Sequence, residues 1–281
     1  MTVLQAVVLG IVQGLTEFLP VSSSGHLIVV PWLFGWRDLL DDPAFNKTFD
    51  VALHFGTFLS LLAYFWHDIG RLLAAWARSL ASRRVATPEA RLAWLVLLST
   101  VPAGVLGLAL EDFIVTALGQ PWMVALLLVA FALGLLAADR LARHVRDLDA
   151  LGWRGALGIG LAQALALAPG VSRSGVTMVA GLLLGLRREA AARFSFLMSI
   201  PVVGGAAAWK GLEVAREGLP AGTAVPFVIG VVSAALSGLL AIWSLLAYLR
   251  RHDFTPFVVY RLALGAGMAV VILAGLRTAG L

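Results

Sequence analysis

The sequence contains no cysteine and few charged residues. Cysteine is absent from all 281 positions, which excludes disulfide bonds, thiolate metal sites and a cysteine nucleophile. Only 13% of the residues are charged, whereas 60% are hydrophobic and the mean hydropathy is +0.92. Ordinary soluble domains carry about 25% charged residues. The composition therefore predicts a membrane protein.

Two features of the charge distribution exclude further classes of protein. No lysine or arginine precedes the N-terminal apolar run, so a cleavable signal peptide is not expected. The net charge of +5 could suggest nucleic acid as a partner, but the basic residues lie in short segments between apolar runs. This placement is typical of membrane proteins, and no nucleic-acid partner is expected.

Apolar runs of two lengths are present. A helix that crosses the hydrocarbon core needs about 20 apolar residues. Six runs meet this test, at 49–67, 93–111, 121–139, 191–210, 225–249 and 256–277. Two others, 3–34 and 156–185, are interrupted near their middles by TEFLPVSSSGH and LAPGVSRSG. Each predicts a re-entrant hairpin, two half-helices joined by a polar turn buried inside the protein.

The two interruptions resemble each other. Residues 22–25 (SSSG) match residues 172–175 (SRSG) at an offset of 150, and FDVALHFGT resembles FSFLMSIPV in the spans that follow. We therefore predict one membrane domain, 1–281, made of two repeats, 1–145 and 150–281. Each repeat holds one hairpin and three spans, and the odd number inverts the second copy. The predicted fold is an all-α integral membrane protein with six transmembrane helices and two re-entrant helix–loop–helix hairpins, about ten helices.

The arginines are distributed unevenly among the connections. They concentrate in alternate segments, at 71–91, 140–154, 187–193 and 250–251, which the positive-inside rule assigns to the cytoplasm. Both termini are then expected on the outer face. The first hairpin would enter from outside and the second from inside, so that their turns meet.

The residues at the two turns predict an anion pocket. Ser22 or Ser23 can cap the first returning half-helix and Ser172 the second. A helix N-terminus presents free N–H groups and a partial positive charge. Arg173 adds a planar fork that suits phosphate.

Ionisable residues near the turns predict chemistry. Glu17, His26 and Arg173 lie where charge is costly in a membrane, and such groups are functional by default. With a serine nucleophile they form a set suited to phosphoryl transfer, in which Glu17 could ligate Mg²⁺ or Ca²⁺. The structural alternative is that the serines bond nearby carbonyls, that Glu17 and Arg173 only pair, and that His26 is a core residue. Gln13, Asp50 and His54 are expected to line the same cavity.

Two long motifs, GIVQGLTEFLPVSSSGHL at 10–27 and ALAPGVSRSGVTM at 166–178, resemble those of the undecaprenyl-diphosphate phosphatase family, also called bacitracin-resistance proteins. The resemblance implies hydrolysis of a C55 isoprenoid diphosphate to the monophosphate carrier of cell-wall synthesis. It also implies a divalent cation and a site open to the outer face of the bacterial cytoplasmic membrane. Carried over by position, the catalytic residues are Glu17, Ser23, His26 and Arg173. The phosphate-binding residues are Ser22, Ser24, Gly25, Ser172, Ser174, Gly175 and Thr177.

Several alternatives remain open from the sequence. Well-known family members carry a second glutamate where this chain has Gln13, which cannot act as a base. Ser23 is the expected nucleophile with His26 as base or proton donor, and direct attack by His26 is the alternative. A lipid-phosphate flippase with the same mid-membrane anion site is the competing function. The sequence does not fix the oligomeric state, and a homodimer is compatible with it.

Overall fold

The computed structural model describes residues 1–217, 219 and 222–280, and within these ranges the chain is helical with no β-strand. Among the described residues, six helices are long and apolar enough to cross a membrane. They are α4 (Pro43–Ser82), α5 (Pro88–Leu118), α6 (Pro121–Leu141), α9 (Arg188–Glu217), α10 (Ala224–Leu249) and α11 (Thr255–Leu273). The predicted all-α integral membrane fold is confirmed.

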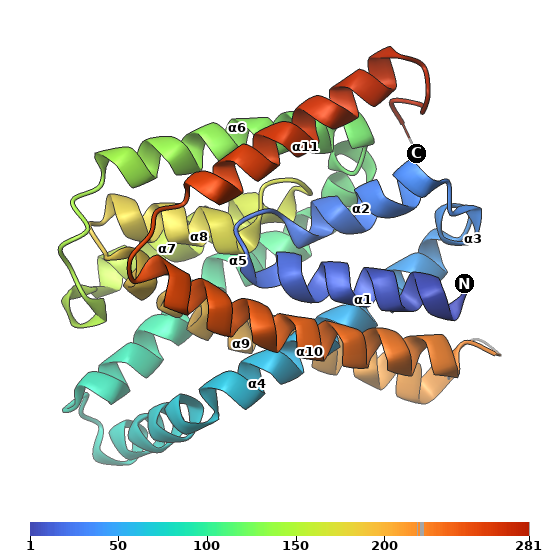
Figure 1. Cartoon of the computed structure of the whole chain (residues 1–281). Helices are drawn as coiled ribbons and strands as arrows, with labels where there is room; N and C mark the ends of the chain where they lie inside the picture. The colour runs from blue at the N-terminus through green and yellow to red at the C-terminus, as the bar shows by residue number, and fades with distance from the viewer. Residues whose placement is uncertain (218, 220–221, 281) are drawn as a thin grey trace.

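Two helical hairpins complete the bundle. The first pairs α1 (Val3–Phe18) with α2 (Ser23–Phe34). The second pairs α7 (Trp153–Ala164), extended by the 3₁₀ turn η2 (Leu165–Leu167), with α8 (Arg173–Leu183). Every half-helix is shorter than the roughly 20 residues that a full crossing needs. The hairpins enter the bundle from opposite ends, and their turns face each other in its middle (Figure 1). We call residues 19–22 the first turn and residues 168–172 the second turn.

Small residues hold the first hairpin against α10. Gly10 and Gly14 of α1 lie on the backbone of α10. A Cβ atom added at Gly14 would lie 2.0 Å from Ser237 Oγ and 2.5 Å from the Ala234 carbonyl oxygen. Close approach through glycine is a common way for helices to pack in a membrane, where the hydrophobic effect contributes little to helix association. This contact fixes α1 and therefore the position of Glu17 near its end.

Several helix boundaries differ from the predicted spans. Three helices run past their predicted ends: α4 extends beyond 49–67, α5 beyond 93–111 and α9 beyond 191–210. Hydropathy marks only the apolar part of a helix, whereas the backbone ladder continues through polar turns. Within α4 the backbone leaves helical values at Phe65 (φ −100°, ψ 15°), which marks a kink before the helix continues to Ser82.

The last span is shorter than predicted. Helix α11 ends at Leu273 rather than near 277, because Gly275 adopts φ 68° and Leu276 N–H bonds back to Val271. This left-handed glycine is a common helix stop. Two short elements that were not predicted, α3 (Arg37–Leu40) and the 3₁₀ turn η1 (Leu148–Ala150), lie in connections.

The arginine-rich connections meet at one end of the bundle. Arg91 donates to the carbonyl oxygens of Asp149 (3.0 Å) and Leu151 (2.8 Å), and Arg188 Nε lies 2.6 Å from the buried Asp139 Oδ1. The two chain termini lie together at the opposite end (Figure 1). Clustered arginines at one end agree with a consistent orientation; the membrane face at which each end lies stays a prediction.

Candidate active site

The two turns share one unusual backbone conformation. Ser22 (φ 78°, ψ 93°) and Ser172 (φ 75°, ψ 111°) both lie at positive φ, which costs a non-glycine residue about 1–3 kcal/mol. Each is the N-cap of its returning half-helix: Gly25 N–H donates to Ser22 Oγ (3.3 Å) and Gly175 N–H donates to Ser172 Oγ (3.1 Å). Capping of the second hairpin by Ser172 is confirmed, and Ser22 rather than Ser23 caps the first.

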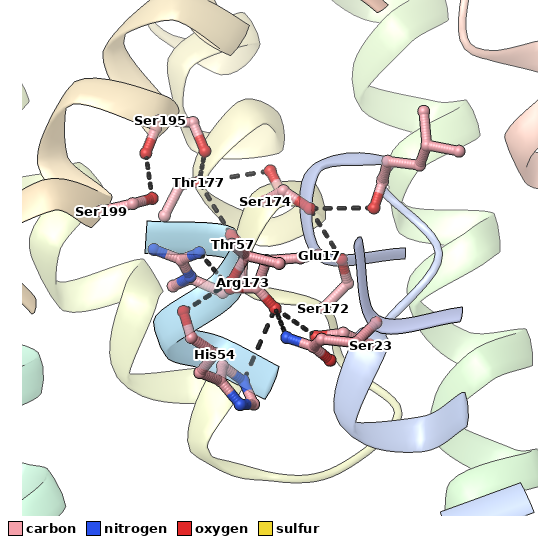
Figure 2. A network of polar contacts seen from close by, with 12 residues as sticks. Glu17, Ser23, His54, Thr57, Ser172, Arg173, Ser174, Thr177, Ser195 and Ser199 are labelled. Atoms are coloured by element: carbon pink, nitrogen blue, oxygen red, sulfur yellow. Dashed lines mark hydrogen bonds and ion pairs between the residues drawn. The ribbon is translucent and has the colours of Figure 1, made fainter. Parts of the chain in front are cut away.

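Glu17 is the centre of a polar cluster between the turns (Figure 2). Arg173 Nη2 donates to Glu17 Oε1 and Ser23 Oγ donates to Glu17 Oε2, both at 2.5 Å. Gln13 Nε2 donates to the same Oε2 at 3.0 Å. The carboxylate thus joins α1, the start of α2 and the start of α8. Glu17 is 6% exposed, so its charge depends on these donors rather than on water.

Two polar atoms of this cluster have no partner among the described residues. Arg173 Nη1 and Gln13 Oε1 are both buried and unbonded. Buried polar atoms are nearly always hydrogen-bonded, so each of these two atoms needs an explanation. A bound anion would satisfy the guanidinium, and a cation or donor would satisfy the amide oxygen.

The hydroxyls of Ser174 and Thr177, at the start of α8, bond to the backbone and to neighbouring hydroxyls. Ser174 Oγ donates to the Leu19 carbonyl oxygen (3.0 Å) and lies 3.2 Å from Ser172 Oγ. Thr177 Oγ1 donates to the Arg173 carbonyl oxygen (2.8 Å) and contacts Ser195 Oγ at 2.7 Å. These bonds tie the second turn to the first and fix the start of α8 (Figure 2).

Ser24 and Gly25, at the start of α2, lie beside the contact between the turns. Ser24 Oγ is 3.5 Å from Ser22 Oγ, and Gly170 N–H donates to Ser22 Oγ at 3.1 Å. A Cβ atom at Gly25 would lie 3.5 Å from Gly170 Cα and 3.2 Å from Val124 Cγ1. The glycine therefore allows the two backbones to approach closely.

Of the two predicted histidines, the ring of His26 points away from Glu17 and the ring of His54 approaches it. The His26 ring bonds the Ser22 carbonyl oxygen through Nδ1 (2.6 Å) and the Tyr260 hydroxyl through Nε2 (2.7 Å), and His26 is 5% exposed. Both ring nitrogens are occupied and none of these bonds reaches Glu17. His54 of α4, by contrast, brings Nε2 to 3.6 Å from Glu17 Oε2. Asp50 joins through its main chain, because its carbonyl oxygen accepts from His54 Nδ1 at 2.7 Å.

One contributor to the site was missed from the sequence. Arg261 of α11 is 1% exposed, and its guanidinium donates to carbonyl oxygens of both turns and of α6. The acceptors are Pro20, Gly170, Val171, Leu127 and Leu128. A lone arginine inside the apolar run 256–277 was the available signal, since an ionisable residue in a span is rarely idle.

The donor set near Glu17 is oxygen-rich and small. Across the described part of the chain, no three histidine or acidic side chains converge as metal ligands. The Glu17 carboxylate with the unpartnered Gln13 Oε1 nevertheless offers two hard oxygen donors, the type that Mg²⁺ and Ca²⁺ prefer. The residues present therefore fit a divalent cation.

Comparison with known proteins decides the family. Residues 6–267 match the family model described as "Bacitracin resistance protein BacA". The chain belongs to this family. Within it, the chain is 48% identical to a protein of Rubrobacter xylanophilus named undecaprenyl-diphosphatase, over 96% of this chain and 98% of that one. It is 49% identical to a protein of the same name from Anaeromyxobacter sp., over 100% of this chain and 91% of that one. The BacA family therefore accounts for nearly the whole sequence, both turns included.

Proposed function

We propose that this protein is an undecaprenyl-diphosphatase. It hydrolyses undecaprenyl diphosphate to undecaprenyl phosphate and inorganic phosphate, which recycles the lipid carrier for cell-wall synthesis and confers resistance to bacitracin. The observation that carries the proposal is the convergence of Ser23 and Arg173, from opposite hairpins, on the single carboxylate of Glu17. Membership of the BacA family supports the substrate.

The geometry supports Ser23 as the nucleophile and Glu17 as its base. Ser23 Oγ already donates its proton to Glu17 Oε2, so attack on the terminal phosphorus passes that proton to the carboxylate. A bond forms between Ser23 Oγ and phosphorus, the bridging P–O bond breaks, and undecaprenyl phosphate leaves. Water then hydrolyses the phosphoserine and releases inorganic phosphate.

Arg173 stabilises the charge that develops on the transferred phosphoryl group. Its Nη2 is held by Glu17, while Nη1 is unpartnered among the described residues and open to a phosphate oxygen. His26 takes a positioning role in this scheme, because its ring bonds the carbonyl of the strained Ser22. Direct attack by His26 through Nε2 would require its bond to the Tyr260 hydroxyl to break.

A divalent cation, Mg²⁺ or Ca²⁺, would be held by Glu17 together with Gln13 Oε1. When bound, such an ion neutralises phosphate charge and orients the diphosphate. Gln13 and Glu17 lie one helical turn apart on the same face of α1, with the Gln13 amide nitrogen on Glu17 Oε2. A half-turn of the Gln13 amide would present Oε1 to an ion held by Glu17.

The proposed location is the bacterial cytoplasmic membrane, with the arginine-rich end inside. Both termini then lie on the outer face, and the site opens toward that face. The clustering of basic connections at the end opposite the termini supports this orientation. A homodimer stays a prediction.

The proposal is tested by phosphate release from undecaprenyl diphosphate with purified protein in detergent. Ser23→Ala is expected to lower kcat about 10³-fold or more, as loss of a nucleophile does. Ser24→Ala is the matched control, because its hydroxyl contacts Ser22 rather than Glu17. Because Ser24 is an expected phosphate-binding residue, this variant should lower kcat, but only about fivefold, since loss of one neutral hydrogen bond costs about 1 kcal/mol.

Chelation and restoration of divalent ions in the same assay tests the cation. Activity is expected to fall to background and return. Equal loss in the Ser23 and Ser24 variants would remove Ser23 as the nucleophile. Tight substrate binding with no phosphate release by the wild type would contradict the phosphatase function and favour the lipid-phosphate flippase.

A further inference from the structure

The orientation of the His54 ring is fixed by its own helix. Nδ1 lies 2.7 Å from the Asp50 carbonyl oxygen, which can only accept, so Nδ1 carries a proton. In the neutral ring Nε2 then holds a lone pair. That nitrogen points at Glu17 Oε2 across 3.6 Å. His54 is the one histidine that the described contacts bring to this cluster.

With the ring neutral, two electron-rich atoms, His54 Nε2 and Glu17 Oε2, face each other at the centre of the site. A lone pair and a carboxylate oxygen repel unless a positive species lies between them. Two atoms that bind one ion at about 2.1 Å each are separated by roughly 3.0–3.5 Å. The separation of 3.6 Å is close to this range and exceeds that of a direct hydrogen bond.

A third donor lies beside them. Gln13 bonds the same Glu17 oxygen through Nε2, and its Oε1 is buried without a partner among the described residues. Amide oxygen and nitrogen exchange places by a half-turn of the side-chain amide, so either atom can be presented at this point. Glu17 Oε2 is thus approached by an imidazole nitrogen and an amide, in addition to the Ser23 hydroxyl at 2.5 Å.

The ring is also held as metal-binding histidines commonly are. A histidine that binds a metal through one nitrogen usually donates its other ring N–H to a carbonyl or carboxylate, which fixes tautomer and orientation. The bond from His54 Nδ1 to Asp50 is of this kind. His26 has the same bond to the residue four positions earlier, but its Nε2 is occupied by Tyr260.

From these contacts we infer that His54 Nε2 is a nitrogen ligand of the site's divalent cation, alongside Glu17 and Gln13. The inference rests on the proposed function, which supplies the cation. It gives the site a mixed nitrogen and oxygen donor set. Calcium binds oxygen donors almost exclusively, whereas imidazole suits transition metals. The site therefore discriminates in favour of Mn²⁺ over Ca²⁺, and His54 is the source of the discrimination.

Electron paramagnetic resonance of bound Mn²⁺ tests the inference without turnover. Purified protein is titrated with Mn²⁺ in the presence of methylenediphosphonate, which supplies a non-hydrolysable diphosphate. Electron spin echo modulation from a coordinated ¹⁴N nucleus is expected in the wild type. His54→Gln should lose this modulation and bind Mn²⁺ about tenfold or more weakly, as loss of a metal-site contact does. Its affinity for Ca²⁺, measured by competition, should change little.

His252→Gln is the matched control. His252 makes the same Nδ1 bond to the carbonyl four residues earlier (3.1 Å) but lies exposed at the end of α10. It should keep the wild-type modulation and affinity. If His54→Gln does not yield folded protein, judged by size exclusion, His54→Ala is measured in its place.

Three results would overturn the inference. The first is ¹⁴N modulation that persists in the His54 variant. The second is an Mn²⁺ affinity of that variant within twofold of wild type. The third is a wild-type protein that binds Mn²⁺ weakly or without ¹⁴N modulation. The last result means that a proton on Nε2, and not a metal, bridges His54 and Glu17. Phosphate release by the wild type is measured separately, so failure of the phosphatase function and failure of this ligand are distinguishable.

Discussion

The two hairpins have nearly the same backbone and different side chains. Both turns place a serine at positive φ as the cap of a returning half-helix. At the offset of 150, however, Ser23 corresponds to Arg173 and Glu17 corresponds to Leu167. In the helices that follow, the matched motifs pair His54 with Ser199. The backbone is common to both halves. In the proposed mechanism the acid and the nucleophile come from the first half, and the guanidinium comes from the second. That mechanism therefore needs both hairpins.

Breaking the contact between the halves should have the largest effect. Arg173→Ala is expected to lower kcat about 10²–10³-fold, because a preorganised donor to the developing charge is lost. Glu17→Gln should lower kcat by a similar factor. The loss of kcat in the double variant should be far smaller than the product of the two single losses, because the residues act as one unit. Phosphate-release kinetics of all four proteins measure the cycle. Multiplicative losses would mean that the two residues work independently.

Arg173→Lys sharpens the same test. The guanidinium bonds Glu17 through one nitrogen and leaves another open, which an ammonium at a single point cannot reproduce. Activity close to wild type in this variant would refute the two-sided role of Arg173.

Removal of the serine N-caps of the two returning half-helices should have the next largest effect, on stability. Ser22 accepts N–H bonds from Gly25 and Gly170, whereas Ser172 accepts one, from Gly175. Ser172→Ala is expected to cost about 1 kcal/mol of unfolding free energy and Ser22→Ala about 2 kcal/mol. Thermal unfolding in detergent, followed by tryptophan fluorescence, measures both. Equal shifts would show that the bond from Gly170 between the turns adds nothing to stability.

The smallest effect concerns a pair of matching glutamines. Gln13 donates to Glu17, but Gln163, at the same place in α7, is 2% exposed with neither amide atom partnered among the described residues. Gln163→Leu is therefore expected to raise the free energy of unfolding by about 1 kcal/mol, because an unpaired buried amide is removed. Gln13→Leu should lower it. A destabilised Gln163→Leu protein would show that ordered water satisfies this amide.

The sequence predicted the hairpins well because their signals are local. A proline followed by a serine–glycine motif stops a half-helix, and serine caps the next one, so PVSSSGH and PGVSRSGV each describe their own turn. The sequence predicted that Glu17 and Arg173 would come close because the two turns meet, and it offered their direct pairing as the structural alternative; the structure shows that they pair. Helix ends were less predictable, since α4 continues through HDIGRLLAAWARSLAS, a segment too polar to be scored as membrane.

The sequence placed His54 in the cavity, as the structure does, but it could not give the direction of either histidine ring, because that direction depends on packing. His26 is close to Ser23 along the chain, yet its ring turns to Tyr260, more than two hundred residues later. His54 is distant in sequence but reaches Glu17 because α4 packs beside α1. Proximity in the chain was a poor guide where three-dimensional neighbours from other helices decide which way a ring faces.

Arg261 restricts the relative motion of the two halves of the molecule. Its single guanidinium holds carbonyl oxygens of the first turn, the second turn and α6 together. Carriers that alternate between membrane faces rock one half against the other around a central site. Here such rocking would have to detach several charge-assisted bonds at once, each contributing about 1.5–3 kcal/mol. A barrier of that size suits a rigid catalyst that waits for its lipid to diffuse in, and makes transport by relative motion of the two halves slow.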